Sequence, residues 1–115
     1  MPNKGRAGED AAAVLLEKKG MRILERNFRS KKGEVDIIAL EGETIVFVEV
    51  KTWAAYGIDA LEQALDSKKQ QRIIETSKYF LSLHREYRYM TVRFDVLLIS
   101  PGGFTHLASA FTEPV

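Results

Sequence analysis

The stretch GEVDIIALEGETIVFVEVKT, residues 33–52, decides the fold of this 115-residue chain. Val35–Leu40 and Thr44–Thr52 are rich in β-branched residues and flank the turn sequence EGET, which together predict a β-hairpin. A hairpin this apolar is expected to be buried, yet it carries Asp36, Glu49 and Lys51. The direction in which these three side chains point therefore decides what the hairpin can do.

The length of the turn sets that direction. Side chains alternate along a strand, so Glu49 and Lys51 share one face. If Gly42–Glu43 is the two-residue turn, Asp36 lies directly opposite Glu49, and if Glu41–Gly42 is the turn, Asp36 reaches Glu49 diagonally. A three-residue loop would send Asp36 to the other face. Either two-residue turn predicts one charged cluster at the end of the hairpin away from the turn.

The remainder of the chain predicts two helices and three more strands. The expected elements are a helix over Gly8–Lys19, a strand over Met21–Asn27, a helix over Ser67–Arg85 with Asp66 as its N-cap, a strand over Thr91–Ser100 and an edge strand over Phe104–Phe111. Trp53–Leu65 favours a loop followed by a short helical turn. The order α-β-β-β-α-β-β predicts an α/β fold with a mixed sheet flanked by helices, as a single domain over residues 1–115.

Composition excludes several classes of protein. Hydrophobic residues make up 45% and charged residues 29%, which indicates a globular chain rather than a disordered one. There is no cysteine, which excludes disulfides and thiolate metal sites and suits a reducing cytoplasm. We expect no membrane segment, because the apolar runs are too short to span a bilayer. The net charge is only +1, so any nucleic-acid binding must come from local basic patches.

The first helix adds a carboxylate to the cluster. Glu9, Ala12, Ala13 and Leu16 follow helical spacing, so Glu9 lies on the apolar stripe and should overhang the edge or end of the sheet. Glu34 has the same parity as Asp36 and either joins the cluster or faces solvent at the start of its strand.

These residue types suit a hard divalent cation. Carboxylates within ~4–6 Å of each other repel unless a cation lies between them, and oxygen ligands favour Mg²⁺ or Mn²⁺. Lys51 could orient an attacking water or balance charge in the transition state. The alternative is an ordinary ion pair across the hairpin, which is the commoner arrangement for any single pair. The convergence of Glu9, Asp36, Glu49 and Lys51 favours the metal site.

Other polar residues favour structural roles. Asp95 stands within an apolar strand and is expected to be shielded by Arg93 on its own face or by a neighbouring loop. His84 and His106 have no partners at metal-ligand spacing and are expected on the surface or in packing.

The pattern Asp36…Glu49-Val50-Lys51, preceded by a helix that bears a Glu, resembles the PD-(D/E)xK nuclease superfamily. The resemblance is closer to the YraN-like family of small bacterial proteins in that superfamily. The segments that carry it are GRAGED (5–10), LEKKGMRILERNFR (16–29), GEVDIIA (33–39), VFVEVKT (46–52) and VRFDVLLI (92–99). Together they cover most of the chain.

The resemblance implies a restriction-endonuclease-like αβββαβ core and a metal-dependent endonuclease that hydrolyses DNA phosphodiester bonds, including branched or damaged DNA. It implies Asp36, Glu49 and Glu9 as ligands of Mg²⁺ or Mn²⁺, and Lys51 as the catalytic lysine. The chain departs from the family's usual pattern at Trp53, where Arg is usual, and at Gln63, where Glu is common. These departures affect substrate contacts rather than the four site residues.

Two basic patches are expected to contact nucleic acid. The first is Arg29, Lys31 and Lys32, with Arg26 just before them, and the second is Lys68, Lys69 and Arg72 at the start of the second helix. The partner expected from this arrangement is DNA, and a homodimer would suit cutting of both strands, although no interface stripe stands out. Two other hypotheses remain open: a nucleic-acid-binding module without turnover, and a structural protein whose hairpin charges form ion pairs.

Overall fold

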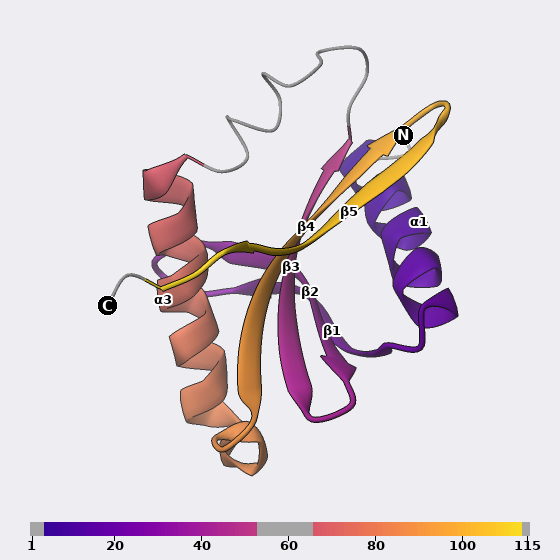
Figure 1. The fold of residues 1–115 in the computed structure, drawn as a ribbon. Coiled ribbons are helices and arrows are strands. Elements are labelled where there is room, and N and C mark those ends of the chain that lie inside the picture. Colours follow the sequence, from indigo (N-terminus) through magenta and orange to yellow (C-terminus); the bar gives the residue numbers. More distant parts are fainter. Residues whose placement is uncertain (1–3, 53–65, 114–115) are drawn as a thin grey trace.

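The computed structural model describes residues 4–52 and 66–113 (Figure 1). Its elements are α1 (Lys4–Lys18), β1 (Arg22–Arg29), β2 (Glu34–Glu41), β3 (Thr44–Thr52), α3 (Ser67–Leu83), the 3₁₀ helix η1 (Arg85–Tyr87), β4 (Thr91–Ser100) and β5 (Gly103–Phe111). The expected order is confirmed, and β3 and β4 have the expected bounds. The short helical turn expected before Asp66, together with Trp53, lies outside the described residues.

Several element boundaries differ from the sequence-based expectation, most of them by one or two residues. Helix α1 begins at Lys4 rather than Gly8, and β1 continues to Arg29. Helix α3 ends at Leu83 rather than Arg85, because the tighter η1 turn begins directly after His84. At its other end α3 is capped as expected, since the Asp66 side chain accepts a hydrogen bond from the Lys69 N–H at 3.1 Å.

The five strands form one mixed sheet in the order β1-β2-β3-β4-β5. Strands β3 and β4 are parallel, and the other neighbours are antiparallel. Figure 1 shows α1 and α3 on opposite sides of this sheet. The predicted α/β class, a mixed sheet flanked by helices, is therefore confirmed.

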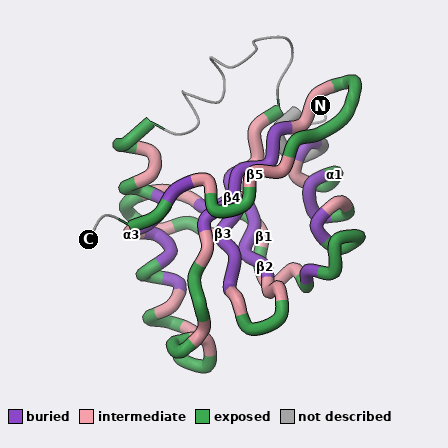
Figure 2. Tube along the Cα trace, in the orientation of Figure 1, coloured by how far each residue is buried: buried purple, intermediate pink, exposed green. Residues whose placement is uncertain are grey.

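Each helix covers its own apolar cluster. The cluster under α1 includes Ala12, Ala13 and Leu16 of the helix with Ile37 and Val48 of the sheet. The cluster under α3 includes Ile73, Ile74 and Phe80 of the helix with Ile38, Ile45 and Phe47 of the sheet. The central strand β3 is buried from Ile45 to Glu49, which Figure 2 shows as a continuous purple stretch. Glu49 thus lies at the end of the buried stretch of β3, a strand with both faces covered.

The hairpin register follows the first of the two turns considered. Glu41 pairs with Thr44 across a Gly42–Glu43 turn, and Gly42 has the positive φ of 60° that such a turn needs. The pairs run to Ile37–Val48, so the same register carried one residue further sets Asp36 opposite Glu49. Asp36 and Glu49 consequently lie at the open end of the hairpin. None of the described helices is long and apolar enough to cross a membrane.

Candidate functional site

Asp36 lies where β2 and β3 stop pairing. The last pair before it is Ile37–Val48, and the Asp36 Oδ2 accepts the backbone N–H of Val50 at 2.7 Å. A carboxylate thus takes the place that a strand carbonyl would hold in a continued ladder. This bond fixes one oxygen of Asp36 against β3.

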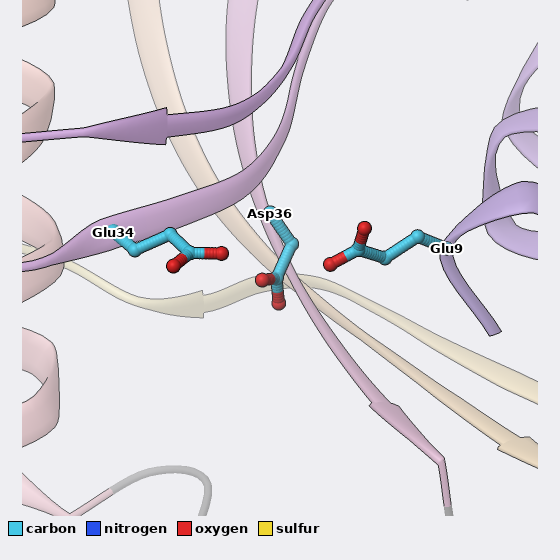
Figure 3. Close-up of side chains that lie close together, drawn as sticks. All are labelled: Glu9, Glu34 and Asp36. Atoms are coloured by element: carbon cyan, nitrogen blue, oxygen red, sulfur yellow. The ribbon is translucent and has the colours of Figure 1, made fainter. Parts of the chain in front are cut away.

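Two further carboxylates come close to Asp36. One oxygen each from Glu9, Glu34 and Asp36 lie within 4.8 Å of one another. Figure 3 shows Glu34 on one side of Asp36 and Glu9, from α1, on the other. The sequence placed Glu9 correctly at the end of the sheet. From the sequence, Glu34 could either join the cluster or face solvent. In the structure it lies beside Asp36.

The approach of α1 to the sheet brings Glu9 into this group. Gly8 lies so near β3 that a Cβ at this position would be 2.4 Å from the Thr52 Oγ1. A side chain at residue 8 would therefore require the hydroxyl of the exposed Thr52 to turn away. The start of α1 thus lies directly against the end of β3.

The Glu49 side chain faces the same region and forms an ion pair with a lysine. Its side chain is 8% exposed, and its Oε1 lies 2.8 Å from the Lys69 Nζ at the start of α3. Asp36 and Glu49 line one cavity of about 360 Å³ together with Lys69 and Arg72. Lys69, which the sequence predicts to contact phosphate, is thus paired with Glu49, which is expected to bind a metal ion.

The electrostatics of the cluster favour added positive charge. Burial, together with the neighbouring charges of Glu49 and Glu9, raises the pKa of Asp36 to about 8, although the Val50 N–H opposes the shift. Burial acts to lower the pKa of Lys69, but its bond to Glu49 outweighs this and raises that pKa. One ammonium therefore offsets Glu49, while Asp36 remains among carboxylates.

Lys51 lies two residues beyond Glu49 on β3. Alternation sets both side chains on the α3 side of the sheet, as the sequence predicts. Lys51 is half-buried and lies within interaction range of Lys69. The residues expected to act together are thus gathered from α1, β2, β3 and α3.

The two basic patches meet beside this cavity. Gly33 in the β1–β2 turn approaches α3 so closely that a Cβ there would be 3.1 Å from the Arg72 Cβ. Arg29 forms an ion pair with Glu34 at 3.1 Å, whereas Lys31, Lys32 and Lys68 are exposed. Two segments far apart in the sequence therefore form one basic border.

Arg26 departs from its expected place in the first basic patch. Its guanidinium binds the Asp10 carboxylate of α1. Arg26 thus ties β1 to α1 rather than facing a ligand. The change in face follows an irregularity of β1 between Ile23 and Glu25, where its pairing with β2 shifts by one residue before Arg26.

A second charged group surrounds Asp95 on β4. Arg93 donates two hydrogen bonds of 2.9 Å to this carboxylate, which confirms the shielding expected from the sequence. His106 Nε2 lies 2.7 Å from Asp95 Oδ2, and the Ser109 N–H donates to Oδ1 at 3.0 Å. The His106 contact has no signal in the sequence, because it depends on the register in which β5 pairs with β4, with His106 opposite Leu97. The Ser109 contact depends on the bulge that follows, where Ser109 has a φ of 53°.

Comparisons with known proteins agree on one family. Residues 8–99 match the family described as "Uncharacterised protein family UPF0102". The chain is similar to a UPF0102 protein of Persephonella marina, at 44% identity over 94% of this chain and 92% of the relative. It is also similar to UPF0102 proteins of Treponema denticola, at 39% identity over 98% of each chain, and of Treponema pallidum, at 42% identity over 96% and 94%. These names state no activity.

Proposed function

This chain belongs to the uncharacterised protein family UPF0102, and we propose that it is a metal-dependent endonuclease acting on DNA phosphodiester bonds. One observation carries the proposal: the half-buried Asp36 lies among Glu9, Glu34 and Glu49 and has a pKa raised to about 8. Carboxylates held this close destabilise the fold unless a cation joins them. Such an arrangement is typical of functional sites rather than of structural ion pairs.

The oxygen set fits a hard divalent cation. Glu9, Glu34 and Asp36 would hold Mg²⁺ or Mn²⁺, and Glu49 would join them by exchanging its bond with Lys69. When bound, the ion would supply Lewis acidity to a phosphoryl oxygen and to water. The protein's own part is to fix Asp36 through the Val50 N–H, so that the carboxylate needs no reorganisation.

Two lysines supply mobile positive charge beside the carboxylates. Lys69 neutralises Glu49 in this structure and, once released, could approach a phosphate. Lys51 would orient the attacking water or balance charge on the transition state. Arg72 lines the same cavity, and Lys68 lies at the start of α3, where backbone N–H groups also attract anions. The cavity thus has acidic groups at its centre and basic groups at its border.

The fold supports a finer assignment within this proposal. The element order αβββαβ carries Asp36 on β2, Glu49 and Lys51 on β3, and Glu9 on α1. This is the arrangement implied by the resemblance to the PD-(D/E)xK nuclease superfamily. The proposal therefore places the family in that superfamily, on the positions of these four side chains.

Cleavage of a substrate panel tests the proposal. Linear duplex, single-stranded and four-way-junction DNA would be incubated with Mg²⁺ or Mn²⁺ and the wild type, Asp36→Asn, Glu49→Gln or Lys51→Ala. We expect the wild type to cut at least one substrate and each variant to lose about 100-fold or more in rate. Glu17→Gln, at an exposed position of α1, is the matched control and should cut normally. Equal cutting by the wild type and the three site variants would refute the site.

A second candidate function rests on the Lys69–Glu49 ion pair. Because this pair occupies an expected metal ligand, the protein could bind nucleic acid without turning it over. Binding by the wild type with no cutting of any substrate would favour this function. Stabilisation by Mn²⁺ that disappears in Asp36→Asn would instead favour the nuclease.

A further inference from the structure

An open groove lies beside the acidic cavity, between the β1–β2 turn and α3. Its volume is about 660 Å³, and its walls are Arg29, Lys31 and Lys32 on one side and Glu75, Lys78 and Tyr79 on the other. Figure 1 shows the β1–β2 turn next to α3. The two hollows share a border, because Arg29 in the groove is paired with Glu34 in the acidic cavity.

The turn that forms one wall is held in place. The Ser30 Oγ accepts the N–H groups of Lys32 at 3.0 Å and Gly33 at 3.3 Å. The same hydroxyl forms a 2.8 Å hydrogen bond with the Thr76 Oγ1 of α3. The backbone that carries Lys31 and Lys32 is therefore fixed to the helix opposite, which reduces the entropy lost when the groove binds a ligand.

The charge of the groove favours an anionic ligand. Arg29 and Lys78 are paired with Glu34 and Glu113. Lys31 and Lys32 are exposed and form no ion pair with any residue in 4–52 or 66–113. Their positive charge is thus available for phosphate groups.

Tyr79 adds an aromatic surface to the groove. Its side chain is 48% exposed, and its ring centroid lies 5.9 Å from that of Phe28, with 32° between the planes. Phe28 in turn packs edge-on against the buried Phe80 at 5.1 Å. The ring is thus supported from behind by the core while its outer surface remains open to a ligand.

The position of Tyr79 sets a distance from the acidic site. Lys69, which binds Glu49, and Tyr79 lie ten residues apart on α3, or about 15 Å along the helix axis. Along the axis of stacked DNA, each nucleotide of one strand rises by about 3.4 Å. A distance of about 15 Å therefore spans about four stacked nucleotides. A strand lying across the acidic cavity would bring a base about four nucleotides away to Tyr79.

We propose that this groove binds the unpaired part of a DNA strand about four nucleotides from the bond that the acidic site cuts. Lys31 and Lys32 contact its phosphates, and one base stacks on Tyr79. Only an unpaired nucleotide can offer its face to an aromatic ring in this way, and stacking with basic contacts needs no particular sequence. The inference rests on the proposed nuclease function and narrows its substrate to DNA with a single-stranded segment beside the cut.

Binding measured without cleavage tests the groove by itself. Fluorescence anisotropy in EDTA would compare single-stranded DNA, blunt duplex and duplex with a single-stranded tail. We expect Tyr79→Ala to weaken binding of the single strand and of the tailed duplex about 5- to 100-fold and to leave blunt duplex unchanged. Tyr79→Phe keeps the ring and should bind as the wild type does.

Matched variants separate the groove from general surface effects. Tyr89→Ala removes an aromatic side chain that is 88% exposed elsewhere and should not affect binding. Lys31→Ala and Lys32→Ala should each reduce the slope of log affinity against log salt by about 0.7 for the single strand, and Lys18→Ala should not. Unchanged single-strand binding by Tyr79→Ala would overturn the proposal, as would an equal loss on blunt duplex.

The same variants distinguish this inference from the proposed function. Cutting that depends on Glu49, combined with single-strand binding that is indifferent to Tyr79, would refute the groove and leave the nuclease. Binding that depends on Tyr79, with no cutting of any DNA, would refute the nuclease and leave the groove. Comparable melting temperatures for Tyr79→Ala and Tyr79→Phe would show that a loss of binding is not a loss of folding.

Discussion

Asp36 and Asp95 lie in the same sheet but have opposite surroundings. Asp95 is fully buried and accepts hydrogen bonds from Arg93, His106 and the Ser109 N–H. Burial would raise its pKa, but these bonds outweigh burial and hold that pKa below its usual value. Asp36 accepts one N–H, and burial together with the carboxylates of Glu49 and Glu9 raises its pKa.

The difference separates a charge that the fold neutralises from the one on which the proposed function rests. The fold supplies Asp95 with the partners that stabilise its ionised form. It supplies Asp36 with a backbone donor and three carboxylates, which stabilise an ionised Asp36 only if a cation arrives. A buried charged group can therefore be assigned by what surrounds it rather than by its burial.

The largest effect is expected from Asp95→Ala. The change leaves Arg93, His106 Nε2 and the Ser109 N–H without their shared acceptor inside the fold. We expect the free energy of unfolding to fall by about 3–5 kcal/mol, measured by urea denaturation at pH 7. A loss below about 1 kcal/mol would mean that Asp95 is not the structural centre described here.

In metal-free protein, Asp36→Asn should raise the free energy of unfolding, whereas Asp95→Ala lowers it. Because the pKa of Asp36 is raised to about 8, the folded chain binds its proton more tightly than the unfolded chain between about pH 4 and 8. Stability in EDTA should therefore fall as pH rises through this range, and the variant should not show this fall. We expect Asp36→Asn to be more stable than wild type by about 1–3 kcal/mol at pH 8. Destabilisation at pH 8 would contradict the contrast with Asp95.

Asp95→Asn tests the pH dependence of the structural carboxylate. Its lowered pKa means that the ionised form stabilises the fold above the unfolded value of about 3.9, and that this stabilisation is lost as pH falls through the folded value. We expect Asp95→Asn to lower the free energy of unfolding by about 1.5 kcal/mol at pH 7. The difference from wild type should shrink in acid, as thermal melts at several pH values would show. A difference that stays constant down to acid pH would rule out this origin.

The smallest effect is expected from Lys69→Met. The change removes the ammonium that pairs with Glu49 and leaves the carboxylates of the cavity without it. Because the lysine side chain is partly exposed, water replaces some of the lost interaction. We expect a loss of about 1 kcal/mol at pH 8, which added Mn²⁺ should reverse. Lys68→Met, at an exposed neighbouring position, is the matched control and should be neutral. A loss that Mn²⁺ does not reverse would mean that Glu49 does not share in cation binding.

The local parts of the site could be predicted from the sequence. Alternation and the turn at Gly42 set Asp36 and Glu49 together, and helical spacing set Glu9 at the end of the sheet. These relations span one hairpin and one helix, where periodicity alone determines which residues share a face. The two-residue turn also removed the alternative in which Asp36 would face away.

The contacts between distant elements could not be predicted in this way. The Lys69–Glu49 pair depends on how α3 lies across the sheet, and the groove at Tyr79 depends on the approach of the β1–β2 turn to the same helix. The sequence grouped Arg26 with the basic turn, but the register shift of β1 between Ile23 and Glu25 sets Arg26 on the side of Asp10. Bulges of this kind change the face of a side chain without a strong sequence signal.

By itself, the sequence determined the order of the elements and, for either two-residue turn, the gathering of Glu9, Asp36 and Glu49 at one end of the sheet. Hydrophobic periodicity acts over neighbouring residues and needs no knowledge of the rest of the chain. Only the tertiary structure decided that His106 and Ser109 join Arg93 at Asp95, that Lys69 pairs with Glu49, and that a basic, aromatic groove lies beside the acidic cavity. Those outcomes depend on helix packing and strand bulges that bring distant residues together, and the free energy of a charge depends on all of its neighbours at once.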